Sequence, residues 1–396
     1  MTERLYYTDP TLLSFDAQVI RVEQVNEREH IFLDRSAFYP TSGGQTYDFG
    51  RLNETDLIEV IETPDGDVAH VVHANQFRVG DRVHGQINAE RRLKNRQQHT
   101  AQHILSHLFI EKMNAETVSV HLGDDYGAIE LNTPAVTDSQ VRDVEQAAAA
   151  VVAGNSPIEI IFVSGDEIAG LPLRKMPQRE GTIRVIRIGQ LDWSACGGTH
   201  CRATSEIGLI KIIGAEKIRG HALVKFLAGS QALADYNLRF SVTDSLAKSL
   251  TCHPSDLVGK VERLVTENKQ LRKDLTHAQR ELLPSRAREL SAMAVAAGTS
   301  IVVAELVSNV DSGLLSPLAT LVANEMNGVA LLACEGRIVI ATTEACGLAA
   351  DKLAREFGQI AGLKGGGNTR VAQLGGGDDK KFLEYKAKFL SVVQGG

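Results

Sequence analysis

The sequence of 396 residues lacks several features that would assign it to a specialised class of protein. Its five cysteines are few and odd in number, so no disulfide framework is expected, and a reducing compartment such as the cytoplasm suits the chain. No apolar run approaches the roughly 20 residues that a membrane span needs. The first ten residues, MTERLYYTDP, contain no apolar block of the kind found in secretory signals. We therefore expect a folded cytoplasmic protein that does not enter the membrane.

An excess of positive charge is also missing. Lys and Arg together number 42 against 49 Asp and Glu, which gives a net charge of −7 at pH 7. Such a chain is not expected to bind nucleic acid over its whole surface, although a local basic stripe can still do so. Hydrophobic residues make up 43% and charged residues 23%, as in ordinary folded domains.

The sequence patterns predict an α+β protein of several domains. Residues 1–88 contain short alternating strands separated by turn signals such as Asp65-Gly66, which indicates a small β-barrel. Residues 89–240 mix helical and strand patterns and predict an α+β domain. Residues 241–295 predict a helical linker, and residues 296–396, with a glycine-rich loop near 365–377, predict a separate α/β domain.

A heptad pattern occupies residues 257–282 of the linker and ends where Pro284 interrupts it. The members of this seam are Leu257, Val261, Leu264, Asn268, Leu271, Leu275, Ala278 and Leu282. A single polar residue in such a seam commonly determines register and oligomeric state, so the segment can form a coiled-coil homodimer. It can equally be an amphipathic helix that packs on its own chain, and the pattern leaves both alternatives open.

Two pairs of metal-binding side chains are the strongest chemical signal. His99 and His103 lie four residues apart in a helical pattern, so both rings project from one face and can share one divalent ion. Further along the chain, Cys196 and His200 flank Gly-Gly-Thr, and the glycines allow a tight turn that brings thiolate and imidazole together. One such pair alone is usually not a metal site. The two pairs together match the ligand types of tetrahedral zinc.

The role of a metal at these residues is left open by the pattern. Zinc peptidases need a glutamate directly after the first histidine, and Thr100 occupies that position here. Four protein ligands would also close the coordination shell. His107 and Cys201 stand beside the two pairs, and each is either a further ligand or a neighbour of the ligands.

These paired motifs resemble the editing domain of alanyl-tRNA synthetases and the free-standing AlaX proteins. The segment FYPTSGGQ at 38–45 is similar to the glycine-rich loop of their N-terminal barrel, and residues 206–208 and 217–220 continue the match. The glycines at 365–367 and 375–377 resemble the C-terminal domain that the synthetases share with DHH-type phosphoesterases. The resemblance covers nearly the whole chain. In its length and order of motifs the chain is similar to the long form of AlaX.

The resemblance implies a hydrolase that deacylates tRNA(Ala) wrongly charged with serine, and also with glycine, and that depends on one zinc ion. No aminoacylation activity is expected, because the synthetases carry their ATP-dependent domain before the barrel, whereas the barrel pattern here starts near residue 1. The phosphate-binding pattern GxxxxGK[ST] is also missing from the sequence.

The resemblance also suggests catalytic residues in the glycine-rich loop. An aminoacylation pocket built for alanine rejects serine poorly, and a second hydrolytic site that binds the serine hydroxyl corrects the error. Thr41 is the candidate reader of that hydroxyl, and Gln45 is expected to orient substrate or water. Without the metal motifs, residues 40–45 would be interpreted as an ordinary turn.

Candidate tRNA contacts come from basic residues near these motifs. A basic run leads into the histidine helix, and further basic residues follow in the matched segments, although His221 stands where the relatives are expected to be basic. The candidates are Arg91, Arg92, Lys94, Arg96, Lys217, Arg219, Lys364 and Arg370. A solvated helix face is the alternative for the basic run.

A second function class also fits the sequence. A noncatalytic tRNA-binding protein or dimeric scaffold could use zinc only structurally, with the heptads and the C-terminal domain as the dimer interface. A phosphoesterase is disfavoured, because the sequence contains no Asp-His-His motif and no aspartate-rich metal cluster.

Overall fold

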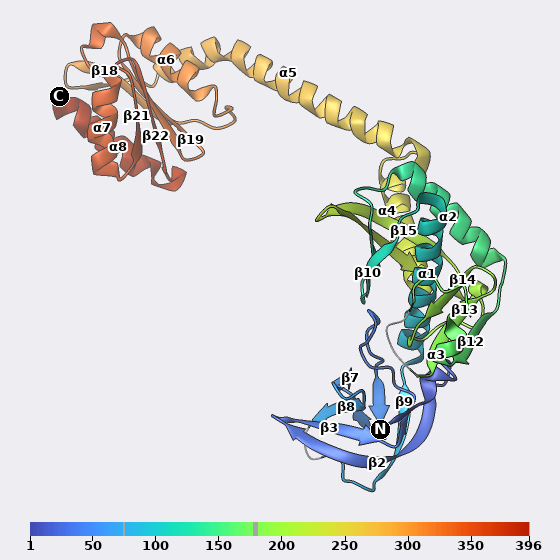
Figure 1. Ribbon diagram of the computed structural model, residues 1–396. Helices are drawn as coiled ribbons and strands as arrows, with labels where there is room; N and C mark the ends of the chain where they lie inside the picture. The colour runs from blue at the N-terminus through green and yellow to red at the C-terminus, as the bar shows by residue number, and fades with distance from the viewer. Residues whose placement is uncertain (74–75, 177–180, 396) are drawn as a thin grey trace. The chain divides into compact units, whose positions relative to one another are not determined.

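The computed structural model describes residues 1–73, 76–176 and 181–395. The chain divides into two compact units, 1–245 and 246–396, and the boundary falls within helix α4, Gly229–Ser249. Figure 1 shows sheets and helices in both units, so the prediction of a mixed α+β protein is confirmed. The finer division into four domains stays a prediction. Within the described ranges, no helix combines the length and apolar character of a membrane span.

A seven-stranded antiparallel sheet occupies the first part of unit 1, in the order β6-β5-β9-β2-β3-β8-β7. Its strands are β2 Ser14–Val25, β3 Arg28–Leu33, β5 Gly50–Leu52, β6 Thr55–Asp56, β7 Glu59–Glu62, β8 Val68–His73 and β9 Arg82–Ile87. The long strand β2 pairs with β9 through its first residues and with β3 through the rest, so it joins the two halves of the sheet. Among the described residues the edge strands β6 and β7 do not pair with each other, and closure into a barrel remains a prediction. A short parallel pair, β1 Glu3–Arg4 with β4 Arg35–Ser36, lies beside this sheet.

Helix α1, Ala89–Met113, is the central element of the second part of unit 1. It begins where the side chain of Asn88 accepts a hydrogen bond from the backbone of Arg91, and it ends at Asn114 in the left-handed conformation. Most of its length is buried, including its polar residues, and its apolar side chains belong to one core with helix α2, Asp138–Ala153.

Two further sheets pack around α1 in unit 1. A four-stranded sheet has the order β10-β11-β16-β15, and a three-stranded sheet has the order β12-β13-β14. The elements are β10 Thr117–Leu122, β11 Gly127–Leu131, β12 Ile158–Val163, α3 Gly165–Ile168, β13 Ile183–Ile188, β14 Asp192–Ala195, β15 Ile210–Ile218 and β16 His221–Ala228. The ends of these strands bring residues that are far apart in the sequence next to α1.

Unit 2 is a six-stranded sheet between two helical layers. The strand order is β17-β18-β19-β20-β22-β21, and Figure 1 shows helices on both sides of it. Helices α7 and α8 belong to the core on one face, whereas α6 and the end of α5 belong to the core on the other. The elements are α5 Leu257–Ser291, β17 Val295–Ala297, β18 Ser300–Leu306, α6 Leu315–Met326, β19 Val329–Cys334, β20 Arg337–Thr342, α7 Ala350–Ala361, β21 Lys364–Gly367, β22 Val371–Gly375 and α8 Phe382–Gly395.

The glycine-rich segment of unit 2 is a β-hairpin, so the prediction of a loop there is wrong. A Cβ atom on Gly365 would lie 1.9 Å from the carbonyl oxygen of Gln373, and one on Gly367 would lie 2.2 Å from that of Val371. These glycines are therefore needed because the backbone of β21 approaches β22 closely. Local sequence favours a loop here, and pairing with β22 overrides it.

Helix α5 continues through Pro284 to Ser291, beyond the point where the heptad pattern stops. Leu283 and Ala287 are buried against α6, and this packing outweighs the loss of one helical hydrogen bond at the proline. The seam residues Leu271 and Leu275 are 65% and 60% exposed. The last turns of α5 therefore pack on their own chain, and dimerisation through 257–282 stays a prediction.

Candidate metal centre

Four side chains from two distant segments converge in unit 1. Helix α1 contributes His99 and His103, and the loop after β14 contributes Cys196 and His200. One ligand atom from each residue lies within 4.8 Å of the others. Cys196 Sγ is 3.5 Å from His99 Nε2 and 3.4 Å from His200 Nε2. The structure therefore brings together all four residues that the sequence predicted as ligands.

Each imidazole has a hydrogen-bond partner on its outer nitrogen. His99 Nδ1 lies 2.8 Å from Gln45 Oε1, His103 Nδ1 lies 3.1 Å from Asp192 Oδ2, and His200 Nδ1 lies 3.3 Å from Thr100 Oγ1. A donated Nδ1–H leaves the inner nitrogen, Nε2, with a lone pair for a metal ion. The residues present thus fit a bound divalent transition metal, since both the ligands and the groups that orient them are in place.

The electrostatics of the cluster favour ligand-competent protonation states for two members. Burial, together with the neighbouring His99 ring, holds the pKa of His200 well below its usual value. Although burial opposes it, the imidazoles of His99 and His200 hold the pKa of the Cys196 thiol well below its usual value. A neutral imidazole and a thiolate are the forms that bind metal. For His103 the hydrogen bond to Asp192 overcomes burial and raises the pKa, so a proton competes with metal at this ring.

The loop that carries Cys196 and His200 is held by Arg184 of β13. Arg184 Nη1 donates to the carbonyl oxygens of Cys196 (2.6 Å) and Gly198 (3.0 Å), and its Nε donates to the carbonyl of Tyr7 (2.9 Å). A Cβ atom on Gly198 would lie 2.1 Å from His99 Cε1, so only glycine allows the loop to pass this ring. The loop geometry therefore depends on a buried arginine that sequence reasoning missed.

The glycine-rich loop 40–45 approaches the cluster through Gln45. Besides His99, the Gln45 amide contacts Thr199, whose backbone N–H donates to Oε1 at 3.1 Å and whose hydroxyl accepts from Nε2 at 3.0 Å. Gln45 is thus placed to position a ligand ring. Thr41 is exposed, and its hydroxyl accepts a hydrogen bond from the backbone of Tyr47 at 3.3 Å. A Cβ atom on Gly44 would lie 2.8 Å from the carbonyl of Val120, so the loop also packs closely on β10.

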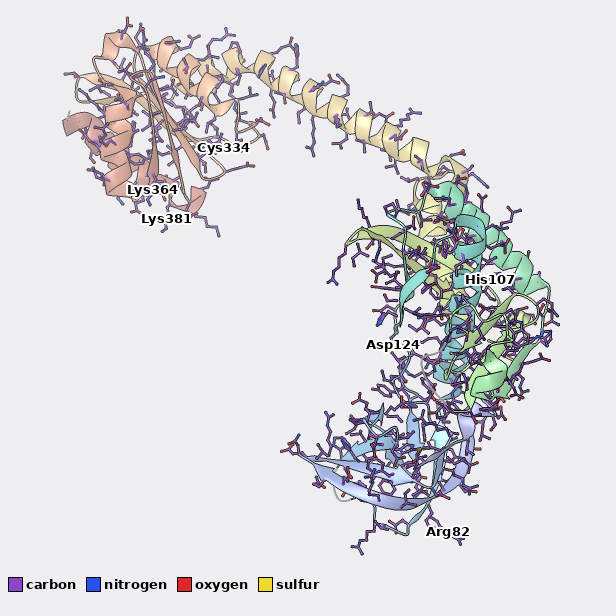
Figure 2. The ribbon with its side chains drawn as sticks, viewed as in Figure 1. Arg82, His107, Asp124, Cys334, Lys364 and Lys381 are labelled. Carbon is purple, nitrogen blue, oxygen red and sulfur yellow. The ribbon has the colours of Figure 1, made fainter. Side chains whose placement is uncertain are left out.

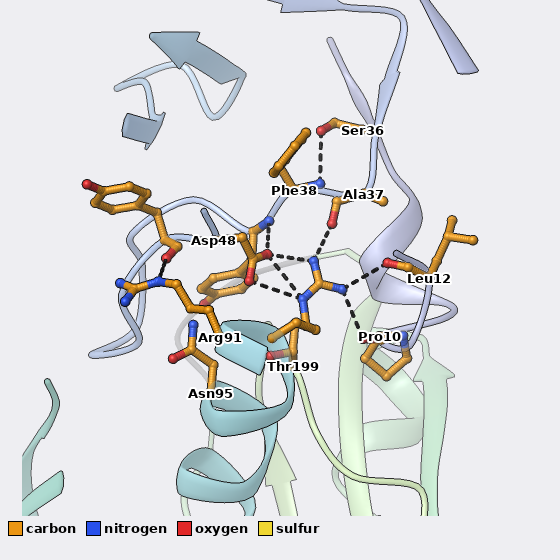
Figure 3. Close-up of polar contacts among 12 residues, drawn as sticks. Pro10, Leu12, Ser36, Ala37, Phe38, Asp48, Arg91, Asn95 and Thr199 are labelled. Atoms are coloured by element: carbon orange, nitrogen blue, oxygen red, sulfur yellow. Dashed lines mark hydrogen bonds and ion pairs between the residues drawn. The ribbon is translucent and has the colours of Figure 1, made fainter. Parts of the chain in front are cut away.

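Arg92 lies inside unit 1, and its prediction as a tRNA contact is wrong. Its guanidinium forms a 2.5 Å ion pair with Asp48, and the two side chains are 1% and 0% exposed. It also donates to the carbonyl oxygens of Pro10, Leu12 and Ala37, as Figure 3 shows. A charge with all its donors engaged by the fold cannot meet an RNA phosphate without unfolding its surroundings. The basic run thus contains a residue that joins α1 to the segments before β2, after β4 and before β5, beside the seven-stranded sheet, which we call the N-terminal sheet.

The rest of the basic run is also engaged with the chain. Arg91 is 7% exposed and bonds Asp124, whereas Arg96 is 8% exposed and bonds Glu206 and the carbonyl of His200. Lys94 Nζ lies 3.0 Å from Asp124 as well. A contact from these residues to RNA would compete with the bonds that the fold already makes.

The other predicted contacts lie on the surface. Lys217 and Arg219 are exposed at the tip of the β15–β16 hairpin, where Arg219 has the left-handed conformation. In unit 2, Lys364 (Figure 2) and Arg370 are exposed, and Arg370 forms an ion pair with Glu344.

The two neighbours of the predicted ligands do not join the cluster. His107 (Figure 2) lies one turn further along α1, 3.8 Å from Glu111. Cys201 is buried, and burial raises the pKa of its thiol to about 11. Asp192, Thr100 and Thr199 were missed by sequence reasoning, because nothing in their local pattern distinguishes them from ordinary strand, helix and loop residues.

Comparisons with known proteins show which families this chain is similar to. Residues 2–91 match the family model of class II (A) tRNA synthetases, and residues 183–222 match the second additional domain of threonyl and alanyl tRNA synthetases. The chain is 31% identical over 423 residues to the alanine–tRNA ligase of Archaeoglobus fulgidus, covering 100% of the chain and 44% of that protein. It is 29% identical over 419 residues to the enzyme of Methanosarcina acetivorans, covering 99% and 44%.

Among solved structures, the C-Ala domain of Aquifex aeolicus alanyl-tRNA synthetase matches 26% of this chain and 97% of its own, with 21% identity and a TM-score of 0.24. A likeness of that size carries no conclusion. The sequence matches place the chain among proteins related to aminoacyl-tRNA synthetases. In particular, it is similar over its length to alanine–tRNA ligases, the similarity that its motifs predicted, and it spans less than half the length of the relatives quoted above.

Proposed function

We propose that this chain is a zinc-dependent hydrolase that removes serine or glycine from wrongly charged tRNA(Ala), without aminoacylation. The observation that carries the proposal is the convergence of His99, His103, Cys196 and His200 beside Gln45 of the glycine-rich loop. In a tetrahedral zinc site a sulfur and a nitrogen ligand are about 3.6 Å apart. The distances of 3.5 and 3.4 Å from Cys196 Sγ to two imidazole nitrogens support that geometry.

In the proposed reaction, water hydrolyses an activated ester. The water oxygen bonds to the carbonyl carbon, the bond from that carbon to the ribose oxygen breaks, and one proton of the water goes to this ribose oxygen, which becomes a hydroxyl. A zinc ion held by these residues would act as a Lewis acid toward the ester carbonyl if the carbonyl oxygen became a fifth ligand or replaced one of the four. As a whole residue Cys196 is less buried than the three histidines, although its thiol is buried, and we propose that an ester and water approach from the loop that carries it.

Other residues of the chain hold the groups that take part in this reaction. Gln45 and Asp192 hold the rings of His99 and His103, and Arg184 holds the loop that carries Cys196. Thr41 is the proposed reader of the serine hydroxyl, because its exposed hydroxyl keeps a hydrogen to donate while it accepts from Tyr47. The proposed RNA contacts are of two kinds. Lys217, Arg219 and Lys364 are exposed, whereas Arg91, Lys94, Arg96 and Arg370 would have to exchange an ion pair within the chain for a phosphate.

The test is a deacylation assay with tRNA(Ala) charged with serine, glycine or alanine, combined with elemental analysis of the protein. We expect release of serine and glycine, retention of alanine, and one zinc ion per chain. His103→Ala and Cys196→Ala should lose zinc and activity together. His107→Ala, on the same helix but outside the cluster, should retain both. A Cys196→Ala protein that keeps full zinc would refute the ligand assignment.

A tRNA-binding scaffold with structural zinc is the second candidate, and the closed set of four protein ligands is the observation that favours it. It predicts zinc and binding of uncharged tRNA(Ala) with no deacylation of any ester. The same assay separates the two candidates.

A further inference from the structure

Phe49 is an exposed aromatic side chain in the segment between the glycine-rich loop and α1. It is 43% exposed, and it lies outside the hydrophobic core of the N-terminal sheet, which contains Phe15 and Phe38. Its ring contacts Arg91, whose guanidinium carbon lies 3.6 Å from the ring centroid, and Tyr47, whose ring meets it edge-on at 5.5 Å. One face of Phe49 is thus covered by a cation, and the ring is held away from the core.

The cation behind Phe49 is fixed in place. Arg91 Nε donates to the carbonyl of Tyr47 at 2.7 Å, Nη1 donates to Asp124 at 2.5 Å, and Nη2 donates to Thr46 Oγ1 at 3.1 Å. These three bonds from different atoms orient the plane of the guanidinium, so Phe49 rests on a rigid support. An exposed phenylalanine by itself is ordinary. Because Arg91 is immobilised, the ring stacked on it keeps one orientation and offers its other face for stacking.

Two parts of the chain connect the Phe49 ring to the metal centre over a short distance. Arg91 and His99 lie on the same helix, separated by about 12 Å of rise. Phe49 follows Gln45, which bonds His99, by four residues. An RNA strand whose terminal ester occupies the metal centre can therefore reach Phe49 with one of its last nucleotides.

We propose that Phe49 stacks on an unpaired base within the last three nucleotides of an RNA whose 3′ end carries the ester. The inference rests on the proposed function. A base is flat, apolar on its faces and joined to phosphate, and proteins that hold single strands combine aromatic stacking with positive charge. Arg91, which lies against the ring, and Lys94 share one carboxylate, Asp124 (Figure 2), so these three groups together carry one net positive charge.

The matched variants are Phe49→Ala and Phe162→Ala. Phe162 is a phenylalanine of the same unit, on β12, and is 46% exposed. With seryl-tRNA(Ala), Phe49→Ala should lower kcat/KM about ten-fold, mainly through KM, while Phe162→Ala leaves it unchanged. Phe49→Tyr should retain activity, whereas Phe49→Leu, which keeps an apolar side chain without a flat ring, should resemble Phe49→Ala. Equal kcat/KM for Phe49→Leu and the unchanged protein would mean a simple apolar contact and would overturn the proposal.

A direct measurement uses tRNA with 2-aminopurine at one of its last three positions, because stacking on an aromatic ring changes its fluorescence. We expect a change at one position with the unchanged protein and none with Phe49→Ala. A change that survives in Phe49→Ala, or no change at any position, would overturn the proposal. If the unchanged protein shows the fluorescence change but releases no amino acid, the proposed hydrolysis fails while the base contact stands. Zinc content and Trp193 fluorescence check that each variant is folded.

Discussion

Arg92 and Asp48 form a 2.5 Å ion pair from which water is excluded, since their side chains are 1% and 0% exposed. The pair joins the start of α1 to the loop that precedes β5, and Asp48 also accepts a hydrogen bond from the backbone of Tyr39 at 2.7 Å. Removing the carboxylate would leave a buried guanidinium without its counter-charge.

Asp48→Ala should therefore lower the free energy of unfolding of unit 1 by about 3–5 kcal/mol. Urea titration followed by the fluorescence of Trp193, the one tryptophan of the chain, measures this in the right unit. The matched control is Glu54→Ala, which removes an exposed partner of Arg51 at 3.7 Å and should change stability by less than about 1 kcal/mol. Similar losses for both variants would mean that burial of the pair has no special importance.

Gln45→Ala should weaken zinc binding about 10- to 100-fold, because nothing then accepts the hydrogen bond from His99 Nδ1. Gln45→Glu keeps an acceptor at this position and should retain most of the affinity. Competition with a chromogenic zinc chelator measures both. Gln86→Ala, an exposed glutamine that bonds Arg51, is the control and should bind zinc normally. Unchanged affinity in Gln45→Ala would exclude a role for Gln45 in holding the ligand ring.

Thr41→Val should reduce the preference for seryl over alanyl tRNA(Ala) about ten-fold, because the hydroxyl that pairs with serine is lost. Thr41→Ser keeps the hydroxyl and should keep the preference. Glycyl-tRNA(Ala) has no side-chain hydroxyl, so its deacylation rate should be the same in all three proteins. Ratios of kcat/KM for the three esters measure the effect, and equal loss on glycyl and seryl esters would indicate damage to the site as a whole.

His70 should make the stability of unit 1 depend on pH. It is fully buried on the N-terminal sheet, bonded to Ser36 and to the carbonyl of Ile31, and burial lowers its pKa to about 4. In the unfolded chain its pKa is about 6.5, so the unfolded state takes up the proton first as pH falls. The stability due to neutral His70 is complete above pH 6.5 and is lost progressively down to pH 4, in total about 3 kcal/mol. Urea titrations between pH 7 and pH 4.5 should show a shallower fall for His70→Gln, and parallel curves would contradict the prediction.

The convergence of the two His/Cys pairs could be predicted because the geometry of each pair is largely local. Spacing of four residues on a helix places His99 and His103 on one face, and two glycines between Cys196 and His200 allow the second pair to turn inward. The groups that orient the rings come from elsewhere, and Gln45 was predicted only as a group that orients substrate or water. Asp192, on β14, meets His103 only because the three-stranded sheet packs beside α1.

The basic run at 91–96 shows the limit of local reasoning. Four basic residues at the start of a helix indicate a surface for RNA, yet Arg92 is buried with Asp48, and Arg91 and Arg96 are bonded within the fold. A run of basic residues indicates that counter-charges are needed. The sequence does not show whether carboxylates of the same chain or phosphates of another molecule provide these counter-charges. The glycines at 365 and 367 have the same ambiguity, since a flexible loop and a close strand pair both require them.

The amino-acid order by itself determined the two His/Cys pairs and the α+β character, because helical spacing, tight turns and alternating apolar residues act over a few neighbours. Its motifs also carried the resemblance to alanine–tRNA ligases. Tertiary structure alone decided that Gln45 and Asp192 hold the ligand rings, that Arg184 holds the cysteine loop, and that Arg92 lies inside. These contacts join residues 12 to 89 positions apart, and they exist because packing the sheets around α1 excludes water and leaves each buried donor in need of an acceptor.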